Sequence, residues 1–302
     1  MAYRIKRGDA TLGAAFRRIA AEQIERGMEE ARDPESIGTA NAVHQVRKRC
    51  KKVRGLIRLV RPGFEDYKQA NKDLRDIARG LSGHRDTGTL IETHDALMKR
   101  AGADRSRFAP VRAALTRDHN ASEDAGDTGA ALARAHDDLA TVAATVPEWL
   151  LRGKSRKTLE LGLSRSFGQA RTAMARARKD PSVDAMHEWR KRVKDHWYHA
   201  RILHPVWPDM MTPERRAAGR LSELLGLHHD LALYADRLVT GDLPDGEGGR
   251  VTALAEHARE QSAIIEQDAF ALGAFLFAED ETAFAARWTR WWRIWKGSGA
   301  PT

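Results

Sequence analysis

A basic helical segment occurs twice in this sequence of 302 residues, and the duplication limits the possible folds more than any other feature. The first copy reads His44-Gln-Val-Arg-Lys-Arg-Cys-Lys-Lys-Val-Arg54, and the second reads His187-Glu-Trp-Arg-Lys-Arg-Val-Lys-Asp-His-Trp197. A shift of 143 residues aligns the copies, and at a shift of 144 the segment 81–86 resembles 225–230. Self-similarity at one period indicates a tandem of related units. We predict one domain over 1–302, made of a first repeat, 1–150, and a second repeat, 151–302.

Helical periodicity of apolar residues covers most of the chain. Ala, Leu, Arg and Glu dominate the composition and only 10 residues are proline, which favours helices over a β-sandwich or barrel. Five prolines fall where a helix is expected to begin or end: Pro34, Pro62, Pro147, Pro181 and Pro205. We predict an all-α fold with loops at 121–129 and 241–249 and helices at 10–31, 36–61, 64–83, 86–100, 107–118, 129–146, 155–179, 182–204, 213–228, 230–240, 248–270 and 279–296.

Each repeated segment has a cationic face and a separate apolar face. At about 100° per residue, the cationic side chains of the first copy fall in an arc of roughly 120°; they are His44, Arg47, Lys48, Lys51, Arg54 and Arg58. Val46, Cys50 and Val53 lie on the apolar face, so we expect Cys50 in the core. The second copy repeats the cationic stripe with His187, Arg190, Lys191, Lys194 and Arg201.

The length and charge of the stripe point to an extended polyanion. It spans about 21 Å at roughly 1.5 Å per residue, which is too long for a single phosphate. Solvated helix faces normally mix charge signs, because like charges four residues apart repel. Residues 44–61 hold eight Lys or Arg and no acid, whereas 187–204 hold five together with Glu188 and Asp195. We therefore expect the stronger positive field at the first copy.

The overall charge also indicates an anionic partner. Lys and Arg number 51 against 42 Asp and Glu, which gives a net charge of +9, and such an excess suits nucleic acid, an anionic membrane surface or a phosphate polymer. No run approaches the roughly 18 apolar residues of a membrane helix, and we identify no signal peptide, so we expect a cytoplasmic protein without membrane partners. A single cysteine excludes a disulfide framework and a zinc site built on cysteines.

The pattern H-x-x-R-K-x-x-K, present twice in a helical chain of this length, resembles the CHAD family of histidine-bearing α-helical domains. The resemblance covers roughly residues 10–296. It implies two four-helix-bundle-like halves related by pseudo-two-fold symmetry, with a basic channel between them. It also implies binding of inorganic polyphosphate and association with polyphosphate granules. The E-x-E-x-K signature of the triphosphate-tunnel enzyme domain that often precedes such domains is missing, so we expect a stand-alone binding module without catalysis or cofactor. Trp197 departs from the first copy, which has Arg54 there.

Further residues are candidates for the same surface. Arg17 is expected to line the channel, Arg165 and Arg171 resemble the family's helix before the second motif, and Arg75 and Arg79 add a basic face. For each of them, ordinary surface charge is an equally good interpretation. His44 and His187 either donate an N–H to phosphate oxygens or fix helix packing.

Other motifs favour a structural role. Neighbouring residues of His228-His229-Asp230 point about 100° apart on a helix, which disfavours a metal site. Asp86 and Asp230 are expected to cap helices. The residues Trp288, Trp291, Trp292 and Trp295 have helical spacing, which we assign to core packing rather than to a membrane interface.

Two other functions compete with polyphosphate binding. A nucleic-acid binder would also use basic helices, but no aromatic residue interrupts the first stripe to stack on bases. A phosphotransfer enzyme would use His44 or His187 as phosphoacceptor, but no acid lies between residues 43 and 61 to assist it. The oligomeric state stays open.

Overall fold

The computed structural model describes residues 3–81, 86–125, 128–241, 243 and 249–297, and within them the fold is all-α, as predicted. An isolated antiparallel β-bridge joins Phe64 to Leu151. The helices are α1 (Leu12–Arg32), α2 (Thr39–Leu59), α3 (Tyr67–Gly80), α4 (Asp86–Ala101), α5 (Arg105–Ala125), α6 (Thr128–Thr145), α7 (Ser155–Lys179), α8 (Val183–Ile202), α9 (Pro208–Thr240), α10 (Arg250–Leu276) and α11 (Glu281–Gly297).

Proline determines several helix boundaries. Pro62, Pro147 and Pro205 each lie in a short 3₁₀ turn that follows an α-helix. Pro34 and Pro181 follow the ends of α1 and α7. A proline lacks the N–H that the next helical turn needs, so these five helix ends are encoded locally. The prediction of helix boundaries at these prolines is confirmed.

Two boundary predictions are wrong. The segments 213–228 and 230–240 form one helix, α9, because the apolar positions Leu225, Leu231 and Leu238 continue a single buried stripe. Asp230 therefore lies inside α9 and caps nothing. Helix α5 extends to Ala125, into the predicted loop at 121–129. Asp86 is the first residue of α4, but its side chain lies outside the described structure.

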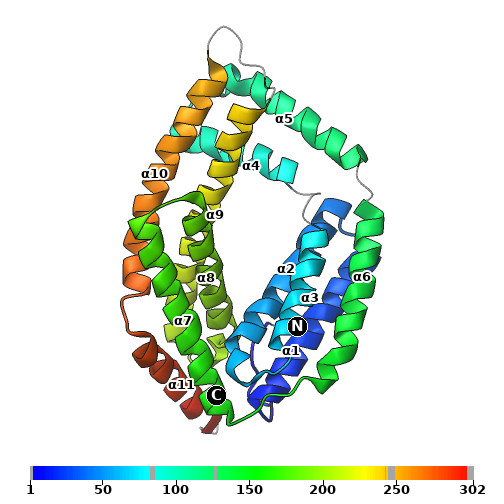
Figure 1. Cartoon of the computed structure of the whole chain (residues 1–302), viewed down its shortest axis with the longest axis vertical. Helices are drawn as coiled ribbons and strands as arrows, with labels where there is room; N and C mark the ends of the chain where they lie inside the picture. The colour runs from blue at the N-terminus through cyan, green and yellow to red at the C-terminus, as the bar shows by residue number, and fades with distance from the viewer. Residues whose placement is uncertain (1–2, 82–85, 126–127, 242, 244–248, 298–302) are drawn as a thin grey trace.

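The helices form two groups that pack against each other through α2, α7 and α8 (Figure 1). Helices α1, α2, α3 and α6 pack together, and α7, α8, α9, α10 and α11 form the other group. The α4–α5 hairpin crosses to the second group, where Leu97 and Phe108 join a separate core with Tyr234 and Leu254. A segment of the predicted first repeat, 86–125, thus packs against the second half of the chain. The division at residue 150 stays a prediction, as does the pseudo-two-fold symmetry.

Helices α2 and α8 meet at a tight seam near their C-terminal ends. A Cβ on Gly55 would lie 2.8 Å from the ring of Tyr198, so only glycine lets the helices approach this closely. The imidazole Nε2 of His199 lies 3.0 Å from the Gly55 carbonyl oxygen, which accepts a hydrogen bond from it. From this seam the two helices diverge towards their N-terminal ends (Figure 1). Side chains of both repeated segments line a cleft between the diverging helices.

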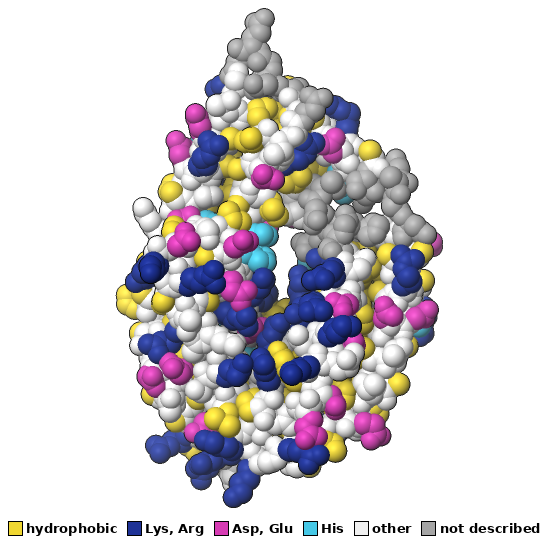
Figure 2. Space-filling view, in the orientation of Figure 1, with side chains coloured by type: hydrophobic (Ala, Val, Ile, Leu, Met, Phe, Trp, Pro, Cys, Tyr) yellow, Lys and Arg dark blue, Asp and Glu magenta, His cyan; other side chains and the backbone are white. Residues whose placement is uncertain are grey.

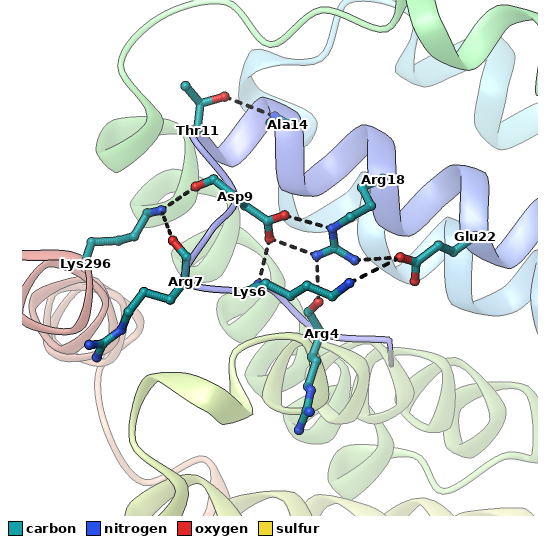
Figure 3. Close-up of polar contacts among 9 residues, drawn as sticks. All are labelled: Arg4, Lys6, Arg7, Asp9, Thr11, Ala14, Arg18, Glu22 and Lys296. Carbon is teal, nitrogen blue, oxygen red and sulfur yellow. Dashed lines mark hydrogen bonds and ion pairs between the residues drawn. The ribbon is translucent and has the colours of Figure 1, made fainter. Parts of the chain in front are cut away.

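The N-terminal segment ties the two groups together. Tyr3 donates from its hydroxyl to the Lys52 carbonyl on α2, at 2.6 Å, and the Ile5 N–H donates to the Ile202 carbonyl on α8. Figure 3 shows the next part of the segment, where Asp9 forms an ion pair with Arg18 at 2.8 Å. Lys296 of α11 donates to the carbonyls of Arg7 and Asp9. The N-terminal segment thus contacts α1 and α2 of the first group and α8 and α11 of the second.

Candidate functional site

A cleft of about 580 Å³ lies between the diverging helices α2 and α8. Its walls also include parts of α3, α4 and α9. Figure 2 shows the hollow, with Lys and Arg side chains gathered along its rim. Nine Lys or Arg residues line it against three acids, Glu92, Asp195 and Asp230; the nine are Arg47, Lys51, Arg54, Arg58, Arg75, Arg79, Arg190, Lys191 and Lys194. The structure therefore brings most of both predicted stripes, and the predicted Arg75 and Arg79, to one concave surface.

Two arginines on the α2 side of the cleft form hydrogen bonds to residues of α3. Arg47 donates from Nη1 to the Ala78 carbonyl near the end of α3, at 3.0 Å. Arg54 donates from Nε to the side-chain oxygen of Asn71, at 3.1 Å. Burial, with a smaller contribution from the charge of Arg58, lowers the pKa of Arg54 to about 10. These bonds fix the orientation of both guanidinium groups, and an arginine has five N–H donors with which to bind an anion.

Basic residues on the α8 side are crowded, and of the three that line the cleft Lys191 forms an ion pair with Glu188 at 3.3 Å. The ammonium of Lys194 lies 4.2 Å from the ring centroid of Trp197, a cation–π contact. Burial, followed by the charge of Arg190, lowers the pKa of Lys194 to about 8. The Nε of Arg190 is buried and has no hydrogen-bond partner among the described residues. An anion in the cleft would relieve this repulsion and satisfy buried donors.

Two histidines meet at the edge of the cleft. The rings of His187 on α8 and His229 on α9 lie 4.1 Å apart between centroids. Each has a buried Nδ1 without a hydrogen-bond partner among the described residues. Burial, and then the neighbouring His229, lowers the pKa of His187 to about 4. At neutral pH His187 is therefore an uncharged imidazole, which can donate one N–H to an anion.

Several predicted site residues lie outside the cleft lining. Arg17 donates to the Trp149 carbonyl at the base of α1, and Arg171 is paired with Glu281. Arg165 is exposed on α7. His44 and Lys48 are half-buried on α2 beside the lining residues, and Arg201 lines a different hollow. Local periodicity predicts which face of a helix these side chains occupy. The packing of the helices decides whether that face lines the cleft or contacts another element.

The structure adds residues that the sequence did not single out for the site. His229, Asp230 and Leu233 enter from α9, and Thr89, Leu90 and Glu92 enter from α4. The second repeat match, at residues 225–230, was the available signal for His229. Asp195 also lines the cleft and forms an ion pair with Arg58 at 2.6 Å, a contact between residues 137 apart in the sequence. No local pattern predicts that contact.

The remaining motifs have structural roles. Cys50 is buried, and burial raises the pKa of its thiol to about 12, so its assignment to the core is confirmed. Trp288 is buried, and Trp291, Trp292 and Trp295 pack partly against the main core. His228 is bonded to Glu266 at 2.8 Å. Within the described ranges there is no cluster of three or more metal-ligating side chains and no helix long and apolar enough to cross a membrane.

Comparison with known proteins decides the family, because the model of the CHAD domain matches residues 10–239. The chain belongs to the CHAD family. A crystal structure of the CHAD domain from the plant Ricinus communis is similar to it, with a TM-score of 0.67 at 20% sequence identity over 92% of this chain and 97% of that chain. The curated proteins include no significant match. CHAD domains are associated in general with polyphosphate binding.

Proposed function

We propose that this CHAD domain binds inorganic polyphosphate in the cleft between α2 and α8, without catalysing a reaction on it. The observation that carries the proposal is the ratio of nine Lys or Arg to three acids on one concave surface. Arg presents a planar fork of donors to phosphate oxygens, and Lys presents a mobile point charge. Neither group reads a base sequence, so the surface suits a homopolymer of phosphate. We further propose that this binding associates the protein with polyphosphate granules in the cytoplasm.

Nucleic acid is the second candidate ligand, and the lining of the cleft favours it less. Proteins that bind single strands stack bases on exposed aromatic rings. Apart from the histidines, the aromatic lining residue of the described cleft is Tyr198, whose ring is buried at the seam. A chain of phosphates needs no such stacking platform. Competition of long-chain polyphosphate against RNA and DNA at physiological salt distinguishes the two ligands.

A variant with six alanines tests the site directly. The substitutions are Arg47→Ala, Lys48→Ala, Lys51→Ala, Arg190→Ala, Lys191→Ala and Lys194→Ala. All six side chains lie off the apolar faces, and their removal relieves like-charge repulsion. We expect a melting temperature equal to or above that of the wild type, and polyphosphate binding weakened by about 100-fold or more.

Controls make this test specific. The matched control replaces Arg156, Arg290 and Arg293, which are exposed in a separate hollow between α7 and α11, and it should bind normally. The α2 triple variant should lose more affinity than the α8 triple variant, because the second stripe already contains acids. A six-alanine variant that binds normally would place the site elsewhere, and one that unfolds would make these residues structural.

A further inference from the structure

A second, smaller hollow lies beside the seam and shares no lining residue with the cleft. Its volume is about 280 Å³. Cationic side chains reach it from the N-terminal segment, α1, α2, α8 and α9, and the argument rests on Arg4, Arg26, Arg49, Lys52, Arg201 and Arg215. No carboxylate is among the described lining residues. A concave surface with this many cations and no acid has a strongly positive potential.

Lys52 is the most deeply buried cation of this hollow. Its residue is 6% exposed, and among the described residues its ammonium has one hydrogen bond, to the Gln23 side-chain oxygen at 3.2 Å. An ammonium has three donors, so two are left for a ligand. Burial, followed by the charges of Arg49, Arg201 and Lys48, lowers the pKa of Lys52 to about 7. The carboxylate that opposes this shift, Glu30, is engaged by Arg49.

The internal repeat explains why this position is unusual. The shift of 143 residues aligns Arg58 with Arg201 and Lys52 with Asp195. At the first place, Arg58 of α2 forms an ion pair with Asp195 of α8 at 2.6 Å. At the equivalent position of the other repeat, Arg201 of α8 lies close enough to Lys52 of α2 for the two positive charges to repel. The carboxylate of Asp195 is thus replaced by the ammonium of Lys52 at the equivalent position, which is a difference of two charges.

Arg201 is not paired with an acid of the described part of the chain. Its guanidinium lies 4.6 Å from the ring of Trp197 and 5.7 Å from the ring of Tyr3. Neither Arg201 nor Arg26 nor Arg215 forms an ion pair with a residue that the structure describes. Several unneutralised guanidinium groups around one ammonium destabilise one another unless an anion binds between them.

We propose that this hollow, the Lys52 site, binds a compact phosphate anion at the place that Asp195 occupies in the equivalent pair. A phosphate or pyrophosphate group suits it better than a carboxylate, because its several charged oxygens accept from guanidinium forks and an ammonium at once. A volume of 280 Å³ equals roughly nine water molecules, which is enough for one or two phosphate groups but not for an extended chain. The proposal does not rest on polyphosphate binding in the cleft.

The phosphate group has two possible sources, a free anion or the end of a longer chain. Trp197 joins the two sites, since its ring contacts both Lys194 of the cleft and Arg201 of the Lys52 site. A chain that leaves the cleft along this contact would bring its terminal phosphate to Lys52. Both sources present the same chemistry to the site, and the experiment separates them.

The test is a calorimetric titration of the full chain with orthophosphate and with pyrophosphate. We expect pyrophosphate to bind, and Arg26→Ala with Arg215→Ala to weaken that binding at least tenfold. The matched control, Arg156→Ala with Arg290→Ala, removes two charges from a different hollow and should leave the affinity unchanged. Thermal melts of each variant show that it is folded. Normal pyrophosphate affinity in the double variant would overturn the proposal, as would the absence of binding to the wild type.

A second measurement reports on Lys52 itself. In protein labelled with ¹⁵N-lysine, the Lys52 ammonium signal is assigned by Lys52→Arg, and its titration is followed with and without pyrophosphate. A bound anion next to the ammonium should raise the pKa of Lys52 by at least one unit. Binding that leaves this titration unchanged would place pyrophosphate elsewhere, even if every variant folds.

Chains with chemically blocked ends distinguish the two sources. If chain ends occupy the site, blocking them should reduce the affinity of long polyphosphate for the wild type but not for the Arg26→Ala, Arg215→Ala variant. If the site takes only the free anion, blocked and unblocked chains should bind equally while pyrophosphate still binds. Loss of long-chain binding in the six-alanine variant is measured separately, so failure of the cleft and failure of the Lys52 site are distinguishable.

Discussion

Arg58 and Asp195 form an ion pair of 2.6 Å across the seam between α2 and α8, where the Asp195 side chain is 5% exposed. The carboxylate also lies 3.9 Å from Arg192. It therefore neutralises part of the floor of the basic cleft while holding two helices together. The charge of Asp195 therefore stabilises the contact between the helices but weakens the attraction of the cleft for a polyanion.

Asp195→Asn should lower stability and raise affinity. The amide keeps the shape but removes the charge, which leaves Arg58 half-buried without its counter-ion and costs about 3 kcal/mol. The cleft gains one positive charge, so polyphosphate should bind more tightly. Chemical denaturation and a polyphosphate titration measure the two effects. Glu92→Gln is the control, because Glu92 is exposed in the cleft and should raise affinity without a comparable loss of stability.

Polyphosphate affinity should fall linearly with the logarithm of salt concentration. Lys and Arg that neutralise phosphates release condensed counter-ions, by analogy with nucleic acids, and the slope reflects the number of contacts. The wild type should show a steep slope, and the six-alanine variant a slope reduced by several units. Titrations at four salt concentrations are sufficient. An affinity that is independent of salt would refute an electrostatic cleft.

Gly162→Ala should destabilise the fold strongly. A Cβ at position 162 on α7 would lie 1.7 Å from the Leu59 carbonyl oxygen at the end of α2, and backbone on both sides must shift to admit it. We expect a loss of about 3 kcal/mol in the free energy of unfolding. Gly80→Ala is the control, because a Cβ there would have no described atom within 4 Å. Equal stability of the two variants in denaturant would contradict the close contact of α7 with α2.

Acid should weaken the seam through His199. Burial lowers the pKa of His199 to about 3, although its bond to the Gly55 carbonyl opposes the shift. Between that value and about 6.5 the unfolded chain holds a proton that the folded protein does not, so stability falls as pH falls. From pH 7 to pH 5 the loss from this residue is about 2 kcal/mol.

His199→Gln should reduce this acid sensitivity. Denaturation curves at pH 7 and pH 5 compare it with the wild type and with His136→Gln on α6, which lies away from the seam. The His199 variant should lose less stability on acidification, whereas the His136 variant should behave as the wild type does. An equal acid response of all three proteins would show that His199 is not held neutral at the seam.

Sequence by itself determined the helices and the two basic faces. Proline positions and apolar periodicity are local properties, so the helix ends at Pro62 and Pro205 and the apolar position of Cys50 follow from neighbouring residues alone. The repeat further showed that both basic segments are helical stripes of the same kind. It is also what relates Lys52 to Asp195.

Tertiary structure decided which basic residues meet. Arg171 and Arg190 look alike in the sequence, but α11 brings Glu281 to Arg171, whereas α9 brings a glycine and a histidine to the surroundings of Arg190. The same holds for α9 itself, which continues past residue 228 because its apolar stripe finds partners on α4 and α10. Such partners lie tens to hundreds of residues away, and only the packing of whole helix faces brings them together, which a local pattern does not encode.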